Sequence, residues 1–220
     1  MNHTASDIIQ LEKLQRKICR QIQGLPDRVA NVATYSLLGV EPIEAVIDKL
    51  ILIFFGSILQ NKDTIEYRII ERQISMDKPN GKSFASLVYD KLRKYKLPDL
   101  MDLMENPIEK HKWKKLVKQK VIEIYWEEAW IEEKQTKSTL KFLNLQHPLF
   151  GNSHQVWKTV PKNSMEVKKA EVKARLLTGT YMLKETKAKF SRNTDTLLCE
   201  LCYEETEDVK ALLTNLSYSQ

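Results

Sequence analysis

The sequence contains few of the residues that break regular structure or crosslink a chain. Among 220 residues there are six glycines, seven prolines and three cysteines. An all-β architecture uses tight turns rich in glycine and proline, so this composition argues against one. Three cysteines do not make a disulfide framework. Their scarcity indicates an intracellular, reducing setting, with the choice between nucleus and cytoplasm left open.

Long apolar runs and targeting segments are also missing. The longest apolar run covers residues 50–55 and reaches residue 59 only through Gly56 and Ser57. A helix that spans a bilayer needs about 20 apolar residues. We therefore expect no membrane contact and interpret this run as part of a buried helix. The first seven residues are polar and do not resemble a signal peptide.

Motifs that carry enzymatic chemistry are absent. The sequence has no glycine-rich phosphate loop, no nucleophile elbow and no paired aspartates of the kind that hold two metal ions. The histidines have neither metal-ligand spacing nor a nearby acid, and we expect them on the surface: His3, His111, His147 and His154. We therefore expect no catalytic residue, no cofactor and no small-molecule substrate.

The clearest positive signal is helical periodicity. In residues 8–22 the apolar positions recur every three or four residues, which predicts a helix with one buried face. Residues 43–58 are apolar on most sides, which predicts a helix at the centre of its bundle. The pattern as a whole predicts an all-α fold, a multi-helix bundle with a small C-terminal appendage. Further helices are expected over residues 64–74, 83–95, 108–134 and 164–178.

One stretch interrupts this periodicity. Residues 146–163 show little pattern and contain turn-forming residues, namely Pro148, Gly151 and Pro161. We predict a linker here. The resulting division is a helical region over residues 1–145, the linker over 146–163, and a basic helix with the appendage over 164–220.

Positive charge is the second signal. The chain carries a net charge of +6, and two predicted helices concentrate it. In the helix over residues 108–134 the lysines precede the glutamates, the reverse of the order that the helix dipole favours. The basic residues in question are Lys110, Lys112, Lys114, Lys115, Lys118 and Lys120 in that helix, and Lys168, Lys169, Lys173 and Arg175 in the later one.

Two interpretations of these cations stay open. They are a surface that binds the phosphate backbone of RNA or DNA, or they are solvated side chains neutralised by neighbouring glutamates. Tryptophans interleave with the lysines, and on a nucleic-acid surface such side chains stack on bases. We expect the tryptophans to lie in the core instead. The lone Cys19 is expected to be a small core residue.

The C-terminal appendage contains half of a metal site. Cys199 and Cys202 have the CxxC spacing that points two thiolates at one zinc ion. A structural zinc site needs two further cysteines or histidines, and residues 203–220 contain neither. We therefore expect a partial site and no stably bound zinc.

Four blocks, in this order along the chain, resemble a known family. They are LEKLQRKICRQIQGLPDRVANVATYSLLGVEPIEAVIDKLILIFFGSIL, WKKLVKQKVIEIYWEE, VKARLLTGTY and CELCYEETEDVKALLTNL. Together they resemble the C-terminal region, downstream of the polymerase palm, of animal non-LTR (LINE-type) retrotransposon reverse transcriptases.

The resemblance implies a helical thumb-like region followed by a degenerate zinc-binding segment. In the family pattern the third and fourth zinc ligands fall at Ala211 and Leu216, which cannot bind zinc. The polymerase aspartates lie outside this chain. The resemblance therefore implies a truncated, non-catalytic descendant of an RNA-directed DNA polymerase. Together with the two basic helices, it leads to the hypothesis of sequence-independent nucleic-acid binding. The alternative is a helical interaction module, or a remnant without a nucleic-acid role.

Overall fold

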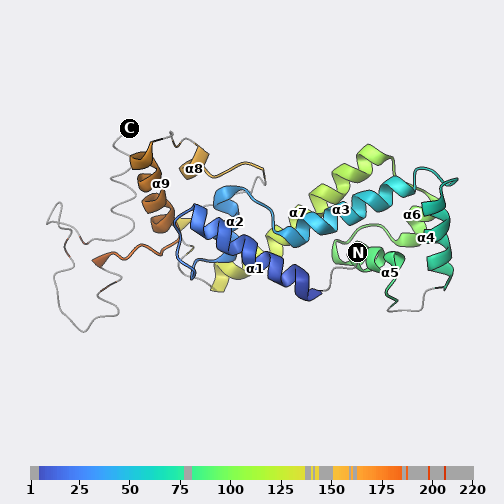
Figure 1. Cartoon of the computed structure of the whole chain (residues 1–220), viewed down its shortest axis with the longest axis horizontal. Coiled ribbons are helices and arrows are strands. Elements are labelled where there is room, and N and C mark those ends of the chain that lie inside the picture. The colour runs from blue at the N-terminus through green and yellow to red at the C-terminus, as the bar shows by residue number, and fades with distance from the viewer. Residues whose placement is uncertain are drawn as a thin grey trace. The chain divides into compact units, whose positions relative to one another are not determined.

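A computed structural model of the chain describes most of the residues before 185. The described residues are 5–76, 81–136, 140, 142–143, 151–158, 160, 163–184, 187, 198 and 206, and the side chains of residues 126–134 are not among them. Over these residues the chain forms nine helices and no strand, which confirms the all-α fold class (Figure 1). None of the described helices combines the length and apolar composition needed to cross a bilayer.

The helices are distributed over two compact units. The first unit comprises Met1–Glu12 and Glu41–Glu132, and the second comprises Lys13–Val40 and Glu133–Gln220. This division differs from the boundary predicted at residues 146–163. The helices in chain order are α1 (Ala5–Ile22), α2 (Asn31–Leu38), α3 (Ile43–Ile58), α4 (Ile65–Met76), α5 (Phe84–Lys94), α6 (Leu100–Glu105), α7 (Lys110–Thr136), α8 (Gln155–Lys158) and α9 (Ser164–Leu177).

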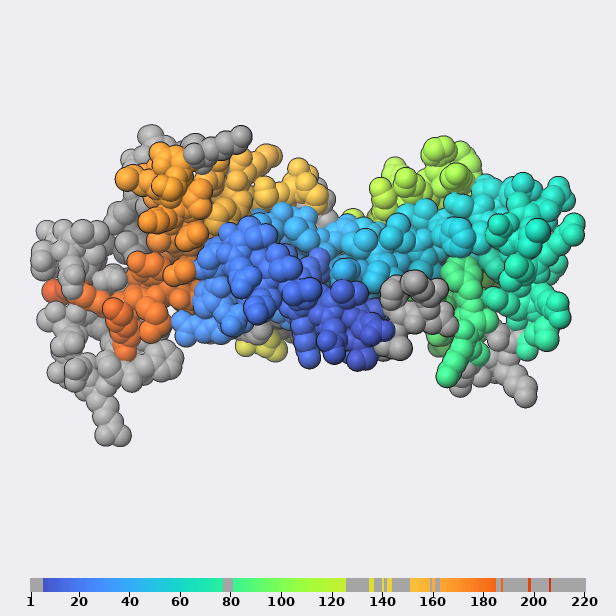
Figure 2. All heavy atoms as spheres, in the orientation of Figure 1, coloured from blue at the N-terminus to red at the C-terminus, as the bar shows by residue number. Residues whose placement is uncertain are grey.

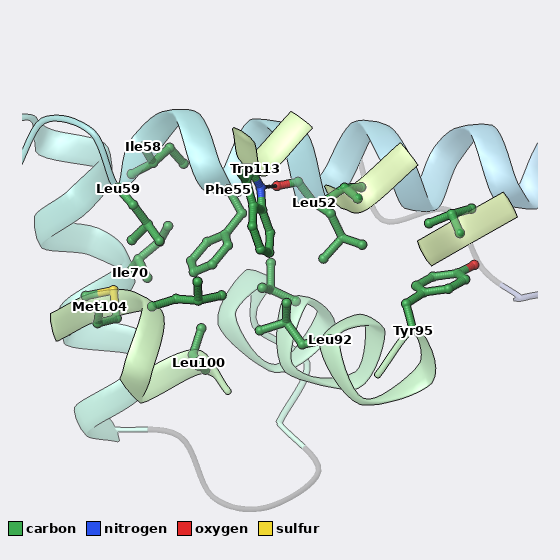
Figure 3. Close-up of a cluster of buried hydrophobic side chains, with 14 of the residues drawn as sticks. Leu52, Phe55, Ile58, Leu59, Ile70, Leu92, Tyr95, Leu100, Met104 and Trp113 are labelled. Carbon is green, nitrogen blue, oxygen red and sulfur yellow. Dashed lines mark hydrogen bonds between the residues drawn. The ribbon is translucent and has the colours of Figure 1, made fainter. Parts of the chain in front are cut away.

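The core of the first unit lies between α3, α4, α5, α6 and the first half of α7 (Figure 3). Leu52 and Phe55 of α3 face Leu92 of α5 in this core, and all three are fully or almost fully buried. Ser83 caps α5 as the sequence predicts, since its hydroxyl accepts a hydrogen bond from the Ser86 N–H at 3.0 Å. Burial of these apolar side chains is the main stabilising contribution to the unit.

Trp113 joins α7 to α3 in this core. Its side chain is 2 % exposed, and its indole N–H donates to the carbonyl of Leu52 at 2.8 Å (Figure 3). The indole lies against Gly56, where an added Cβ would come 2.0 Å from Trp113 Cδ1. The expectation that the tryptophans lie in the core is confirmed for Trp113. The side chains of Trp126 and Trp130 lie outside the described set.

Helix α3 is buried or half-buried on most of its sides, as its composition predicts. The exceptions are Leu50 and Phe54, which are 61 % and 55 % exposed, whereas the acid Asp48 is completely buried. Leu50 and Phe54 lie four residues apart and form a short apolar ridge, because apolar composition alone does not show which sides of a helix have neighbours.

The second unit joins residues that are far apart in the sequence. Helix α2 ends at Gly39, whose φ of +68° is the left-handed conformation that glycine adopts readily. The N–H of Gly151 donates to the Gly39 carbonyl at 2.7 Å, and the His154 N–H donates to the Leu37 carbonyl at 2.9 Å. A Cβ on Gly39 would lie 2.2 Å from the Asn152 carbonyl oxygen. The described residues 151–158 of the predicted linker are thus bound to the end of α2.

Two side chains extend this connection. The buried amide of Gln23 donates to the Cys19 and Thr34 carbonyls at 3.0 and 2.9 Å and accepts from the Trp157 indole N–H at 3.3 Å. Arg175 Nε donates to the Gly24 carbonyl at 2.7 Å. These contacts explain why Lys13–Val40 belongs with the C-terminal unit.

The apolar stripe of α1 does not form the buried face predicted for it. Leu14 and Ile22 are 54 % and 62 % exposed, and Leu11 and Ile18 are also exposed. The buried positions at this end of the chain are Cys19 of α1 and Gln23, which follows the helix. Periodicity identifies an apolar stripe but not what covers it, and the hydrogen bonds of Gln23 allow a polar side chain to take the buried position.

Candidate nucleic-acid interface

The rotation of α7 about its axis is set by a buried row in its first half. Trp113, Val117, Val121 and Ile124 recur at helical spacing, and all four are buried. The residues on the opposite side of the helix therefore face outward. In Figure 2 the start of α7 forms a ridge (light green) beside α3 (cyan).

The outward side carries a row of positive charge. Lys110, Lys114 and Lys118 are spaced by four residues, so their side chains follow one another along the helix. His111 and Lys115 form a second row beside them. All five residues are exposed, and together they are called the lysine stripe. At 1.5 Å per residue the stripe is about 12 Å long.

Ion pairing distinguishes the lysine stripe from its neighbours. Lys112 pairs with Glu109 at 3.2 Å, and Lys120 pairs with Glu123 at 2.8 Å. Among the described side chains, no acid pairs with any member of the stripe. Neutralisation by neighbouring glutamates therefore applies to Lys112 and Lys120 but not to the stripe.

The basic residues of α9 are more heterogeneous. Lys168 is exposed and Lys173 is half-buried. Lys169 pairs with Glu166 at 2.6 Å. Arg175 is half-buried and directs its Nε to the protein's own backbone at Gly24. This helix therefore presents fewer unpaired charges than α7, and it belongs to the other unit.

The predicted half-site for zinc lies outside the described residues. This is true of Cys199 and Cys202 and of Ala211 and Leu216, so the prediction stays a prediction. In the part of the chain that the structure describes, no group of three or more His, Cys, Asp or Glu residues is placed to hold a metal ion. Cys19 is a buried free thiol, as expected, and burial raises its pKa while the charge of Arg20 opposes this shift.

Sequence reasoning missed a buried charged cluster in the first unit. The Tyr95 hydroxyl donates to Asp48 Oδ2 at 2.5 Å. Lys94 donates to the same oxygen at 3.1 Å and to Glu44 at 2.7 Å. Lys91 Nζ lies 2.8 Å from Asp48 Oδ1, an ion pair whose angle falls outside hydrogen-bond geometry. The close distance between opposite charges makes this a true ion pair, so Asp48 has a counter-charge on each oxygen.

The cluster stabilises its charged forms. Burial by itself lowers the pKa of Lys94, but the hydrogen bond to Glu44 and the charge of Asp48 outweigh burial and raise it. Burial and the hydrogen bond to Asp48 raise the pKa of Tyr95 far above its usual range, so the phenol stays a donor. We interpret the cluster as a brace between α3 and α5. An acid four residues before the buried Leu52, within an apolar helix, is the signal that could have revealed it.

A pocket of about 280 Å³ lies beside this brace in the first unit. Its apolar walls include Ile47, Ile51 and Phe84. Its charged lining is balanced, with Asp48 and Asp90 against Lys82 and Lys91. The lining therefore selects neither an anion nor a cation.

Four surface features of the described residues are thus available for function: the lysine stripe, the α9 cations, the pocket and the exposed apolar stripe of α1. No protein-family model, curated protein or solved structure matches the chain. The choice among the four features depends on charge, exposure and pairing. By these criteria the lysine stripe is the strongest candidate, because its lysines are exposed and carry no described counter-charge.

Proposed function

We propose that the protein is non-catalytic and binds the phosphate backbone of nucleic acid through the lysine stripe, without reading sequence. The observation that carries this proposal is the set of four exposed lysines with no ion pair among the described side chains. Lysine ammonium groups act as point charges toward phosphate. Contacts of this kind position a protein on the backbone and carry no sequence information.

The place of the lysine stripe on its helix supports the proposal. The stripe begins at Lys110, the first residue of α7. A cation in the first turn of a helix lowers the stability of that helix by about 0.3–1 kcal/mol. A phosphate bound there reverses this effect, because anions are favoured at the positive end of a helix. Nucleic-acid binding therefore accounts for the unusual order of charges along α7.

Descent from a reverse transcriptase is part of the same proposal. The resemblance of the four sequence blocks to the post-polymerase region of LINE-type retrotransposons supports it. That origin gives a reason for a backbone-binding surface on a chain without catalytic groups of its own.

The proposal is tested with the full chain carrying Lys114→Gln and Lys118→Gln. Fluorescence anisotropy with a labelled duplex, repeated over a salt series, measures the affinity and its salt dependence. Each lost phosphate contact reduces the slope of log K against log salt by about 0.9, so the double variant should reduce it by about 1.8 and weaken binding roughly ten-fold or more.

The matched control is Lys62→Gln with Lys96→Gln. Both lysines are exposed, belong to the first unit and lie outside the lysine stripe. The control changes net charge by the same amount but should leave the salt slope unchanged. If the two double variants weaken binding equally, the stripe is not the binding surface. Binding that is independent of salt would contradict the backbone mechanism.

A helical interaction module is the second candidate. The exposed apolar stripe of α1, with Leu11, Leu14, Ile18 and Ile22, is the observation that favours it. The two candidates differ in the anisotropy experiment. A helical interaction module should show no binding to nucleic acid at physiological salt.

A further inference from the structure

We infer that the lysine stripe binds double-stranded rather than single-stranded nucleic acid. This inference rests on the proposed function and names the form of the ligand. Two properties of the first half of α7 support it: the side chains that the stripe lacks and the linear arrangement of its charges.

The lysine stripe offers no large aromatic side chain. Surfaces that bind single strands combine positive charge with aromatic rings on which successive bases stack. Trp113, the tryptophan within this stretch of α7, is buried, and its indole N–H is bound to the Leu52 carbonyl at 2.8 Å. It therefore cannot stack on a base without leaving the core. His111 is the one ring in the stripe, and a single imidazole offers less stacking surface than the successive rings of a single-strand site.

The charges of the lysine stripe lie in a line on a supported helix. Lys110, Lys114 and Lys118 are about 6 Å apart along the helix axis, and Lys115 adds a charge in the neighbouring row. Double-stranded DNA carries one phosphate charge per about 1.7 Å of its axis, about twice the density of one of its strands, so a duplex along the stripe brings more phosphates near these lysines. The buried row of Trp113, Val117 and Val121 fixes the opposite face of α7, so the backbone that carries the lysines is held in place. A stiff duplex already presents its phosphates in a row, whereas a single strand would have to be ordered on binding.

The cations of the lysine stripe are all lysines. Arginine commonly recognises base edges in the major groove through bidentate hydrogen bonds. Lysine instead interacts with phosphate as a point charge. The stripe is therefore suited to contact phosphates without reading sequence. DNA and RNA duplexes share this chemistry, and separate arms of the test distinguish them.

The experiment measures binding of the full chain by fluorescence anisotropy. The probes are a 16-base-pair DNA duplex, each of its two strands alone, and an RNA duplex of the same sequence. We expect the dissociation constant for at least one duplex to be ten-fold or more below that of either strand at equal salt. With four lysines engaged, the salt slope should be about −3.6 for the duplex, against about −2.8 for a strand.

A gain-of-function variant tests the reason for this preference. His111→Trp places a stacking ring within the lysine stripe and should raise single-strand affinity five-fold or more, with less effect on the duplex. Gln21→Trp is the control, since Gln21 is exposed on α1 and far from the stripe in sequence. Unchanged single-strand affinity in His111→Trp would overturn the inference.

The outcomes separate the inference from the proposed function. If strands bind as tightly as duplexes and Lys114→Gln/Lys118→Gln still weakens both, the preference for a duplex is overturned and backbone binding through the lysine stripe stands. If neither form binds, the proposed function fails and the inference fails with it. Duplex binding that is strong and sensitive to the stripe variants supports both.

Discussion

At the scale of single residues, Gly56 shows how the absence of a side chain can determine the packing of a core. A glycine inside an α-helix is normally destabilising by about 0.5–1 kcal/mol relative to alanine. In α3 it provides the space that the Trp113 indole occupies, because an added Cβ would lie 2.0 Å from the ring. Apolar composition predicted the burial of Trp113. It did not indicate Gly56 as the partner, since a helix sequence does not show which neighbour approaches it most closely.

Gly56→Ala should therefore destabilise the first unit, contrary to the usual helix propensity. We expect a loss of about 1–3 kcal/mol, the usual effect of overpacking a core. Urea unfolding followed by Trp fluorescence measures it. Ser57→Ala, at the neighbouring position, should change stability by less than about 0.5 kcal/mol. Increased stability in Gly56→Ala would show that the indole does not pack on this glycine.

Single residues also distinguish the ion-paired lysines of α7 from those of the lysine stripe. Sequence alone identified the lysines in the first half of α7, but not which of them form ion pairs. Lys112 and Lys120 pair with Glu109 and Glu123 three positions away, and such pairs are visible in a sequence only once the helix boundaries are known. The contact of Arg175 with Gly24 depends on tertiary packing and has no local signal.

At the scale of elements, helix ends follow local chemistry and facing partners do not. Ser83 begins α5 and Gly39 ends α2 as local chemistry requires. The buried side of α1 was assigned wrongly, and neither the exposed ridge of Leu50 and Phe54 nor the buried Asp48 of α3 was predicted, because the relevant partners come from elsewhere in the chain. Asp48 is the clearest case. Its burial depends on Lys91 and Lys94 of α5 and on Tyr95, the residue that follows this helix.

Asp48→Asn tests the brace between α3 and α5. The Tyr95 hydroxyl can still donate to the amide oxygen, but the two lysines lose their buried counter-charge. Breaking a buried pair costs about 3–5 kcal/mol, and we expect about 2–3 here because solvent screens the exposed part of Lys94. The Lys94 side chain is 34 % exposed.

The control for this variant is Glu44→Gln, which removes a carboxylate whose side chain is 33 % exposed. It should cost less than about 1 kcal/mol. Chemical denaturation at neutral pH compares the two variants. Equal losses would indicate that Asp48 contributes no more than a surface ion pair.

At the scale of the whole molecule, the two units should respond differently to pH. Burial lowers the pKa of His154 in the second unit from its ordinary value of 6.5. Its Nδ1 accepts from the Val156 N–H at 3.2 Å, which requires the neutral ring. Below pH 6.5 the unfolded chain therefore takes up a proton that the folded unit does not, so unfolding becomes more favourable as pH falls through the window between the two pKa values.

Hydrogen exchange, corrected for the intrinsic effect of pH, measures this difference. Between pH 7.5 and 5.5 the amides of residues 31–40 and 151–158 should lose protection, by at most about 1.4 kcal/mol per pH unit, and by less because the ring is partly exposed. Residues 48–58 of the first unit should not follow. His154→Asn keeps an acceptor near the Val156 N–H without the titration and should abolish the effect. Loss of protection in both units alike would contradict the prediction.

The hydrogen bonds from Gly151 and His154 to the end of α2 also dictate an order of folding. Helix α2 is synthesised early, but the residues that cover it follow more than 110 positions later. At about 5–20 residues per second, a ribosome takes roughly 6–25 s to reach them. During that interval Glu41–Glu132 can fold as a unit of its own. Lys13–Val40 cannot complete its packing until the later residues of its own unit, 133–220, have been synthesised. We therefore expect the first-synthesised part of the second unit to complete its packing last, and to stay accessible to chaperones and proteases until then.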